Sequence, residues 1–98
     1  VDDASIREGI RWGWEEYGQM WCPHTAAGVQ AYRTHIAAGA KGDWIVAGTA
    51  HPAKFNEIVE PIIGRPAPMP AALRALMDRP VSVREIEPEL GALVSAIV

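Results

Sequence analysis

The sequence is poor in cysteine, in positive charge and in long apolar runs. Cys22 is its only cysteine, so an internal disulfide is excluded, and the paired spacing of a structural zinc site is missing. The 9 Lys and Arg residues are scattered among 12 Asp and Glu residues, unlike the concentrated positive charge that binds nucleic acid. No apolar run approaches the about 20 residues that span a bilayer. These absences favour a protein of the reducing cytoplasm without nucleic-acid, membrane or metal partners.

What the sequence does have is the composition of an ordinary folded protein. Hydrophobic residues make up 49% and charged residues 21% of the 98 positions, so a packed core is expected rather than disorder. A chain of this length forms at most one small domain, and we predict a single unit over residues 1–98. The chain starts at Val1, without a methionine, and enters a helical pattern at once. This favours a segment of a longer polypeptide.

Hydrophobic periodicity predicts two helices in the first 40 residues. The first follows an aspartate cap at position 2 or 3 and ends at Gly18. Its buried stripe comprises Ile6, Ile10, Trp14 and Tyr17. Pro23 opens the second helix, which ends near Gly39. The buried stripe of this helix comprises Val29, Tyr32 and Ile36.

The middle of the chain predicts a strand followed by a helix. Residues 44–48 are almost all apolar, which is typical of a strand covered on both faces in a parallel sheet. The helix starts at Pro52 and stops at Gly64. Pro61 lacks an amide hydrogen and crowds the preceding turn, so a kink or an early end is expected there.

The last third of the chain predicts three further elements after a proline-rich connection over residues 65–70. They are a short helix over 70–78, a brief strand over 81–86, and a closing helix from Pro88 with an inward apolar face. The complete order is α-α-β-α-α-β-α. We therefore predict an α/β fold with helices packed on a short, mostly parallel sheet.

The stretch over residues 48–55 carries the most informative side chains. Thr49 and His51 lie just after the predicted strand and just before a helix, where open α/β sheets bind ligands. The helix start at Pro52 would also offer free amides to an anionic group. The alternative is that Thr49 and His51 only satisfy backbone groups at the turn, and the residues taken alone favour this structural role.

The start of the second helix is another candidate site. His24 could act as an acid or a base near neutral pH, although a capping or packing role is more common for such a histidine. Cys22 could be reactive at a helix start, but a packed, inert thiol is favoured. Trp12 and Trp14 point to different sides of a helix, which favours burial at an interface over a ligand platform.

These stretches together resemble a known family. Residues 48–55, GTAHPAKF, resemble the signature near the carboxyl terminus of bacterial and fungal threonine synthases. Residues 23–26, PHTA, precede it with the order and spacing of that family, and residues 1–3 and 69–80 agree as well. The similarity covers essentially the whole chain but only the last quarter or so of the family's length.

The resemblance implies a fold-type-II enzyme that uses pyridoxal 5'-phosphate to convert O-phospho-L-homoserine and water to L-threonine and phosphate. The lysine that holds the cofactor would lie upstream, in the remainder of the polypeptide, so this segment alone is expected to be inactive. By similarity, the Thr49 hydroxyl faces the pyridine nitrogen and, unlike a carboxylate, does not enforce its protonation. Further residues expected to line the active site are His24, Ala50, His51 and Lys54.

Two other functions stay open at this point. One is a phospho-lyase similar to threonine synthase, which would release a keto acid, and the other is a catalytically silent interaction domain. The sequence also departs from the family at Cys22, where an acidic residue is usual, and at Pro61, which interrupts a helix.

Overall fold

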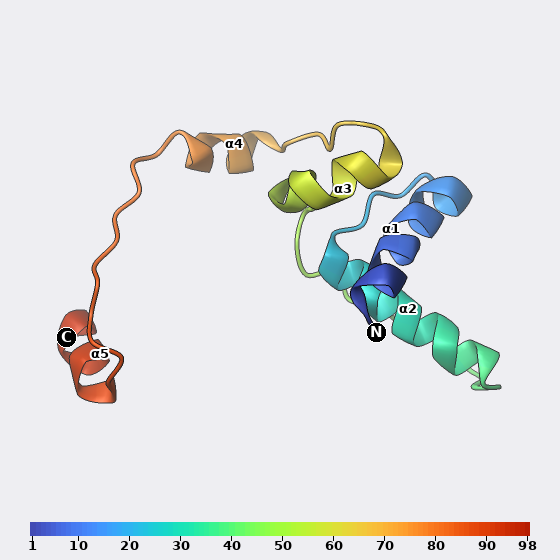
Figure 1. Ribbon diagram of the computed structural model, residues 1–98, viewed down its shortest axis with the longest axis horizontal. Helices are drawn as coiled ribbons and strands as arrows, with labels where there is room; N and C mark the ends of the chain where they lie inside the picture. Colours follow the sequence, from blue (N-terminus) through green and yellow to red (C-terminus); the bar gives the residue numbers. More distant parts are fainter.

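A computed structural model describes all residues 1–98, and every regular element in it is helical. The elements are α1 (Asp3–Tyr17), α2 (Pro23–Ala37), the 3-10 helix η1 (Pro52–Phe55), α3 (Asn56–Ile63), α4 (Ala71–Met77) and α5 (Leu90–Ile97), as shown in Figure 1. None of these helices is both long and apolar enough to span a membrane.

The first two helices begin and end where local chemistry dictates. The Asp2 carboxylate caps α1 by accepting a hydrogen bond of 2.8 Å from the Ser5 amide, and hydrogen bonding by the Ser5 hydroxyl and then by its amide lowers the pKa of Asp2. Gly18 ends α1 with a φ of 63°, a left-handed conformation that glycine adopts without strain. Pro23 is the first residue of α2, as predicted.

The core lies where α1, α2 and α3 meet. Ile10 of α1, Ala26 of α2, and Val59 and Ile63 of α3 form its buried centre. α1 and α2 approach closely at Gly9, where a Cβ atom would lie 3.2 Å from the Ala26 carbonyl oxygen, and a Cβ atom on Gly13 would overlap the Trp21 ring of the connection. The packed part of the molecule is therefore a cluster of three helices (Figure 1).

The predicted sheet is wrong for this chain. Residues 44–48 and 81–86 lie in extended connections, and neither segment forms a strand. A strand needs a neighbouring backbone to satisfy its N–H and C=O groups, whereas an apolar run reports only that side chains require cover. Trp44 and Val46 contact α2 but remain 47% and 36% exposed, and Ile45 is 96% exposed. The α/β prediction is replaced by an all-helical arrangement.

The connection after α3 is held to the core. α3 continues for two residues beyond Pro61 and ends at Gly64, which has a φ of 69°. Glu60 Oε1 then accepts a hydrogen bond of 2.8 Å from the amide of Ala67, which is buried. The Arg65 guanidinium lies 5.4 Å from the centre of the Trp14 ring, within range of a cation–π contact. These contacts extend the packed region to residue 67.

The remainder of the chain leaves this packed region. The radius of gyration is 18.1 Å, whereas a compact domain of this length has about 13 Å. Figure 1 shows α5 at the far end of an extended segment, away from α1, α2 and α3. The apolar face predicted for the closing helix is not turned inward, because Leu90 is 77% and Ile97 75% exposed. The predicted buried stripes also fail at Tyr17 and Ile36, both of which are exposed.

Candidate functional site

Residues 44–50 run along α2 in the opposite direction, toward the start of that helix. The Trp44 ring stacks on His35 with centroids 5.8 Å apart, and Val46 Cγ1 lies 3.1 Å from where a Cβ on Gly28 would be. A Cβ on Gly48 would lie 3.8 Å from Thr25 Oγ1. The extended segment therefore carries Thr49 and Ala50 to the amino-terminal end of α2.

Cys22 anchors this end of α2. Its side chain is 1% exposed, and Sγ accepts a hydrogen bond of 3.4 Å from the Thr25 amide and lies 3.3 Å from Thr25 Oγ1. Burial raises the pKa of the thiol, but the Thr25 hydroxyl and the amides of Thr25, His24 and Ala50 outweigh burial and lower the pKa. Packing of Cys22 is thus confirmed, and its sulfur caps the start of α2.

Thr49 is exposed at this turn, and no hydrogen bond within the protein engages its hydroxyl. Its neighbour Ala50 is partly buried against the start of α2. The Thr49 hydroxyl can therefore donate to, or accept from, a group supplied from outside this chain.

His51 has a structural contact of its own. Its Nδ1 accepts a hydrogen bond of 3.1 Å from the Ala53 amide, which caps η1. Because Nδ1 accepts, the tautomer in this arrangement carries its proton on Nε2. The predicted long helix from Pro52 begins instead as a four-residue 3-10 turn, and α3 starts at Asn56. The capping role that the residues favoured for His51 is confirmed.

The two predicted stretches lie side by side. The His24 ring meets the Phe55 ring edge to face, with centroids 5.0 Å apart and an angle of 64° between the ring planes. His24 is exposed at the start of α2, beside the turn that carries Thr49. The structure therefore brings His24, Thr25 and Cys22 together with residues 48–55.

Lys54 faces different surroundings from the other candidates. It lines a hollow of about 230 Å³ between η1 and α4, whose other lining residues are Ala53, Asn56, Met69, Leu73 and Met77. Residues 53–56 and residues 69–77 each supply half of its lining. Lys54 is thus the predicted site residue that the fold separates from the start of α2.

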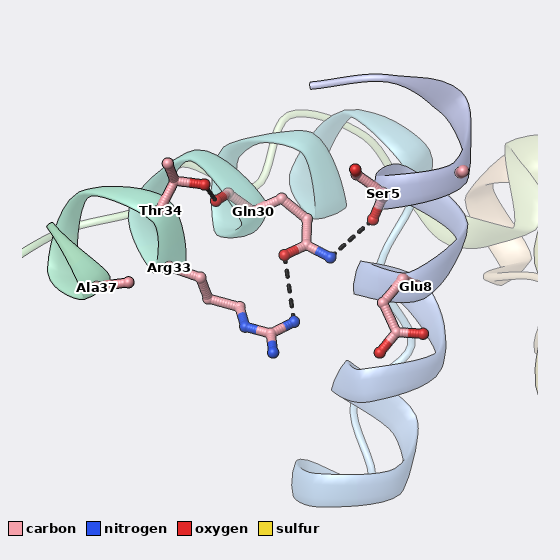
Figure 2. Close-up of a pocket in the computed structure, with 7 residues that line it drawn as sticks. Ser5, Glu8, Gln30, Arg33, Thr34 and Ala37 are labelled. Carbon is pink, nitrogen blue, oxygen red and sulfur yellow. Dashed lines mark hydrogen bonds between the residues drawn. The ribbon is translucent and has the colours of Figure 1, made fainter.

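The largest hollow, about 570 Å³, lies between α1 and α2 and was not indicated by the sequence (Figure 2). Gln30 crosses it, with Nε2 donating to the Ser5 carbonyl at 2.7 Å and Oε1 accepting from Arg33 at 3.2 Å. Its central polar groups satisfy one another, and it is widely open to solvent. We therefore interpret it as the surface of a helix crossing.

Several aromatic rings line a groove, and the sequence predicted only one feature of it, the different directions of Trp12 and Trp14. Trp12 packs with Tyr17 and Trp21 at centroid distances of 5.0 and 6.0 Å, and the Arg33 guanidinium lies 4.4 Å from the Trp12 ring centre. Trp14 points the other way and packs against the core, which confirms the prediction that the two tryptophans face different sides. The partnership with Tyr17 and Trp21 depends on the crossing of helices, and no local spacing encodes it.

The start of α2 and the turn after residue 48 share one exposed surface. A capped helix start and an exposed turn converge, but the surface beside them is open and no group of three potential metal ligands is present.

The chain belongs to the carboxyl-terminal family of threonine synthases, whose description "Threonine synthase, C-terminal" matches residues 25–98. It is 37% identical over 93 residues to threonine synthase of Serratia marcescens and 34% identical over 93 residues to that of Escherichia coli. Each alignment covers 95% of this chain and 21% of the relative. The Pseudomonas aeruginosa threonine synthase is 38% identical over 80 residues, which are 81% of this chain and 17% of that protein.

The chain therefore spans about a fifth of the length of the curated relatives it matches. No solved structure matches it. The resemblance inferred from GTAHPAKF and PHTA is confirmed at the level of the family.

Proposed function

We propose that this chain is the carboxyl-terminal part of a threonine synthase that converts O-phospho-L-homoserine and water to L-threonine and phosphate in the cytoplasm. Membership of the family and collinear identity to three threonine synthases support this proposal. So does the contact between the two signature stretches, which are separated in sequence but adjacent at the start of α2.

The observation that carries the proposal is the free hydroxyl of Thr49 on a turn that is otherwise fixed. Gly48 lies beside Thr25 on one side of Thr49, and His51 caps η1 on the other. A hydroxyl in this position fits the ring nitrogen of pyridoxal phosphate, because it can hydrogen-bond to a neutral nitrogen without a charge that would protonate it. When bound, the cofactor supplies an electron sink for elimination and replacement at the substrate.

Other parts of the cofactor site are assigned to the upstream polypeptide in this proposal. Lys54 lines the hollow beside α4, and Lys41 lies in the connection after α2, so neither accompanies Thr49. We therefore propose that the lysine that holds the cofactor and the groups that bind its phosphate precede Val1, and that the 98-residue chain is inactive alone.

The remaining candidates have supporting roles in this proposal. His51 orders the turn through its bond to the Ala53 amide, and Ala50 seats the turn on the helix start. His24 is exposed beside them and lines the mouth of the site. Lys54 lies at the outer edge, near α4.

Replacing Thr49 in the full-length protein tests the function. Thr49→Val keeps the shape but removes the hydroxyl, and it is expected to lower kcat by about 10- to 100-fold, the value of one buried hydrogen bond. Thr49→Ser is the matched control and keeps most of the activity. Products are measured from O-phosphohomoserine. Threonine supports the proposal, whereas 2-oxobutyrate without threonine shows a phospho-lyase, and no turnover with no bound cofactor shows a silent domain.

A further inference from the structure

The carboxyl-terminal arm, residues 79–98, has an apolar face without a partner in this chain. Its exposed large side chains are Val81, Val83, Ile86, Leu90, Leu93, Val94, Ile97 and Val98. None of the principal helix contacts involves α5, and the hollow beside it is lined only by residues 86–90 and Leu93 of the arm itself. Figure 1 shows the arm extended away from the core.

α5 cannot be stable as a free helix. It has eight residues, fewer than the about 12 to 15 that an isolated helix needs in water, and no side chain caps its first turn. Its apolar residues nevertheless recur at positions 90, 93, 94 and 97, the spacing of a helix with one buried face. The arm therefore requires a surface to pack against.

We propose that α5 docks through this face onto the upstream region of the same polypeptide, an inference that rests on the function proposed above. The family match runs to residue 98, so the arm belongs to the shared family segment. About four-fifths of each of the two longest-matching relatives has no counterpart in this structure. A large body of the same polypeptide is thus available to cover the arm.

A second copy of the chain is a poorer occupant. A stable interface between proteins takes about 20 to 30 residues from each side, whereas α5 offers eight. A segment tethered to its own polypeptide needs a smaller contact, because its effective concentration is high. With the arm docked, residues 1–98 form a single unit through the upstream region.

Photocrosslinking in the full-length protein tests the occupant directly. Leu93 is replaced by p-benzoylphenylalanine, and Ser95, on the opposite side of α5, receives the same group as a control. From position 93, the expected crosslink joins the arm to a peptide upstream of Val1 within one polypeptide. A crosslink between two copies, or a yield at position 93 no higher than at position 95, overturns the proposal.

Limited digestion with trypsin is a second test of docking and needs no modified residue. Arg84 is the one basic residue after Pro80 and is exposed in this structure. In the docked full-length protein, cleavage after Arg84 is expected to be slow. Leu93→Asp should accelerate it at least tenfold, and Ser95→Asp should leave it unchanged. Rapid cleavage of the unmodified protein, or equal rates in both variants, contradicts docking.

The crosslinking and trypsin measurements do not depend on catalysis. A protein that docks its arm but forms no threonine refutes the proposed function and leaves this inference standing. A protein that forms threonine while its arm is freely cleaved refutes only the docking.

Discussion

Residues 1–67 and residues 68–98 are both rich in apolar side chains, but only the first region buries them against its own elements. In the first region, helices with complementary small and large residues meet around Ile10 and Val59, both fully buried. In the second region, α4 and α5 have no buried residue at all. The difference teaches that apolar patterning specifies a need for a partner, while the partner itself depends on which segments are present.

The largest expected difference between the regions is in the cost of removing a core side chain. Ile10→Ala should lower the free energy of unfolding by about 2–5 kcal/mol, because it leaves a cavity among three helices. Ile97→Ala, at a residue that is 75% exposed, should cost less than about 0.5 kcal/mol in the 98-residue chain. Urea unfolding of the two variants measures both values. Equal costs would contradict the division into a packed and an unpartnered region.

A smaller effect is expected at the boundary between the regions. Glu60→Ala removes the acceptor for the Ala67 amide, which is buried, and should cost about 1 kcal/mol. Glu60→Gln keeps an acceptor oxygen and serves as the control. Hydrogen exchange of the Ala67 amide is the measurement, and exchange in Glu60→Ala no faster than in the control would show that the bond does not hold this connection.

The smallest effect concerns the sulfur cap of α2. The pKa of Cys22 is lowered on folding, so the folded state releases the proton before the unfolded state does. The thiolate form of Cys22 therefore stabilises the folded state. This contribution is lost as pH falls through the pKa of Cys22 in the folded protein, and it is fully present only above the ordinary thiol pKa. Relative to Cys22→Ser, the full-length protein should therefore gain stability between neutral pH and about pH 9. Thermal unfolding at several pH values checks this, and a constant difference argues against it.

Local signals in the sequence predicted much of the packed region. Asp2, Gly18, Pro23 and Gly64 act through their own backbone geometry, so the limits of α1, the start of α2 and the end of α3 follow from the residues themselves. The contact of His24 with Phe55 was not predicted, because no local spacing encodes the meeting of two separate stretches.

The sheet and the orientation of the arm could not be predicted in the same way. Pairing of a strand depends on a distant backbone, and the apolar run at residues 44–48 contacts a helix surface here instead of a second strand. Likewise, the spacing of Leu90, Leu93 and Ile97 defines a face without saying what covers it. Lys54 lies in the 3-10 helix η1 and lines a hollow beside α4, and the helical pattern predicts neither feature.

The placement of Thr49 opposite the cofactor ring is tested most directly by nitrogen NMR of the full-length protein loaded with pyridoxal phosphate labelled at its ring nitrogen. Thr49→Asp should move the resonance to the range of a protonated nitrogen, because a carboxylate stabilises the pyridinium, while Thr49→Ser should leave it near that of the unmodified protein. A resonance that is the same in all three proteins would contradict the placement of Thr49 at that nitrogen.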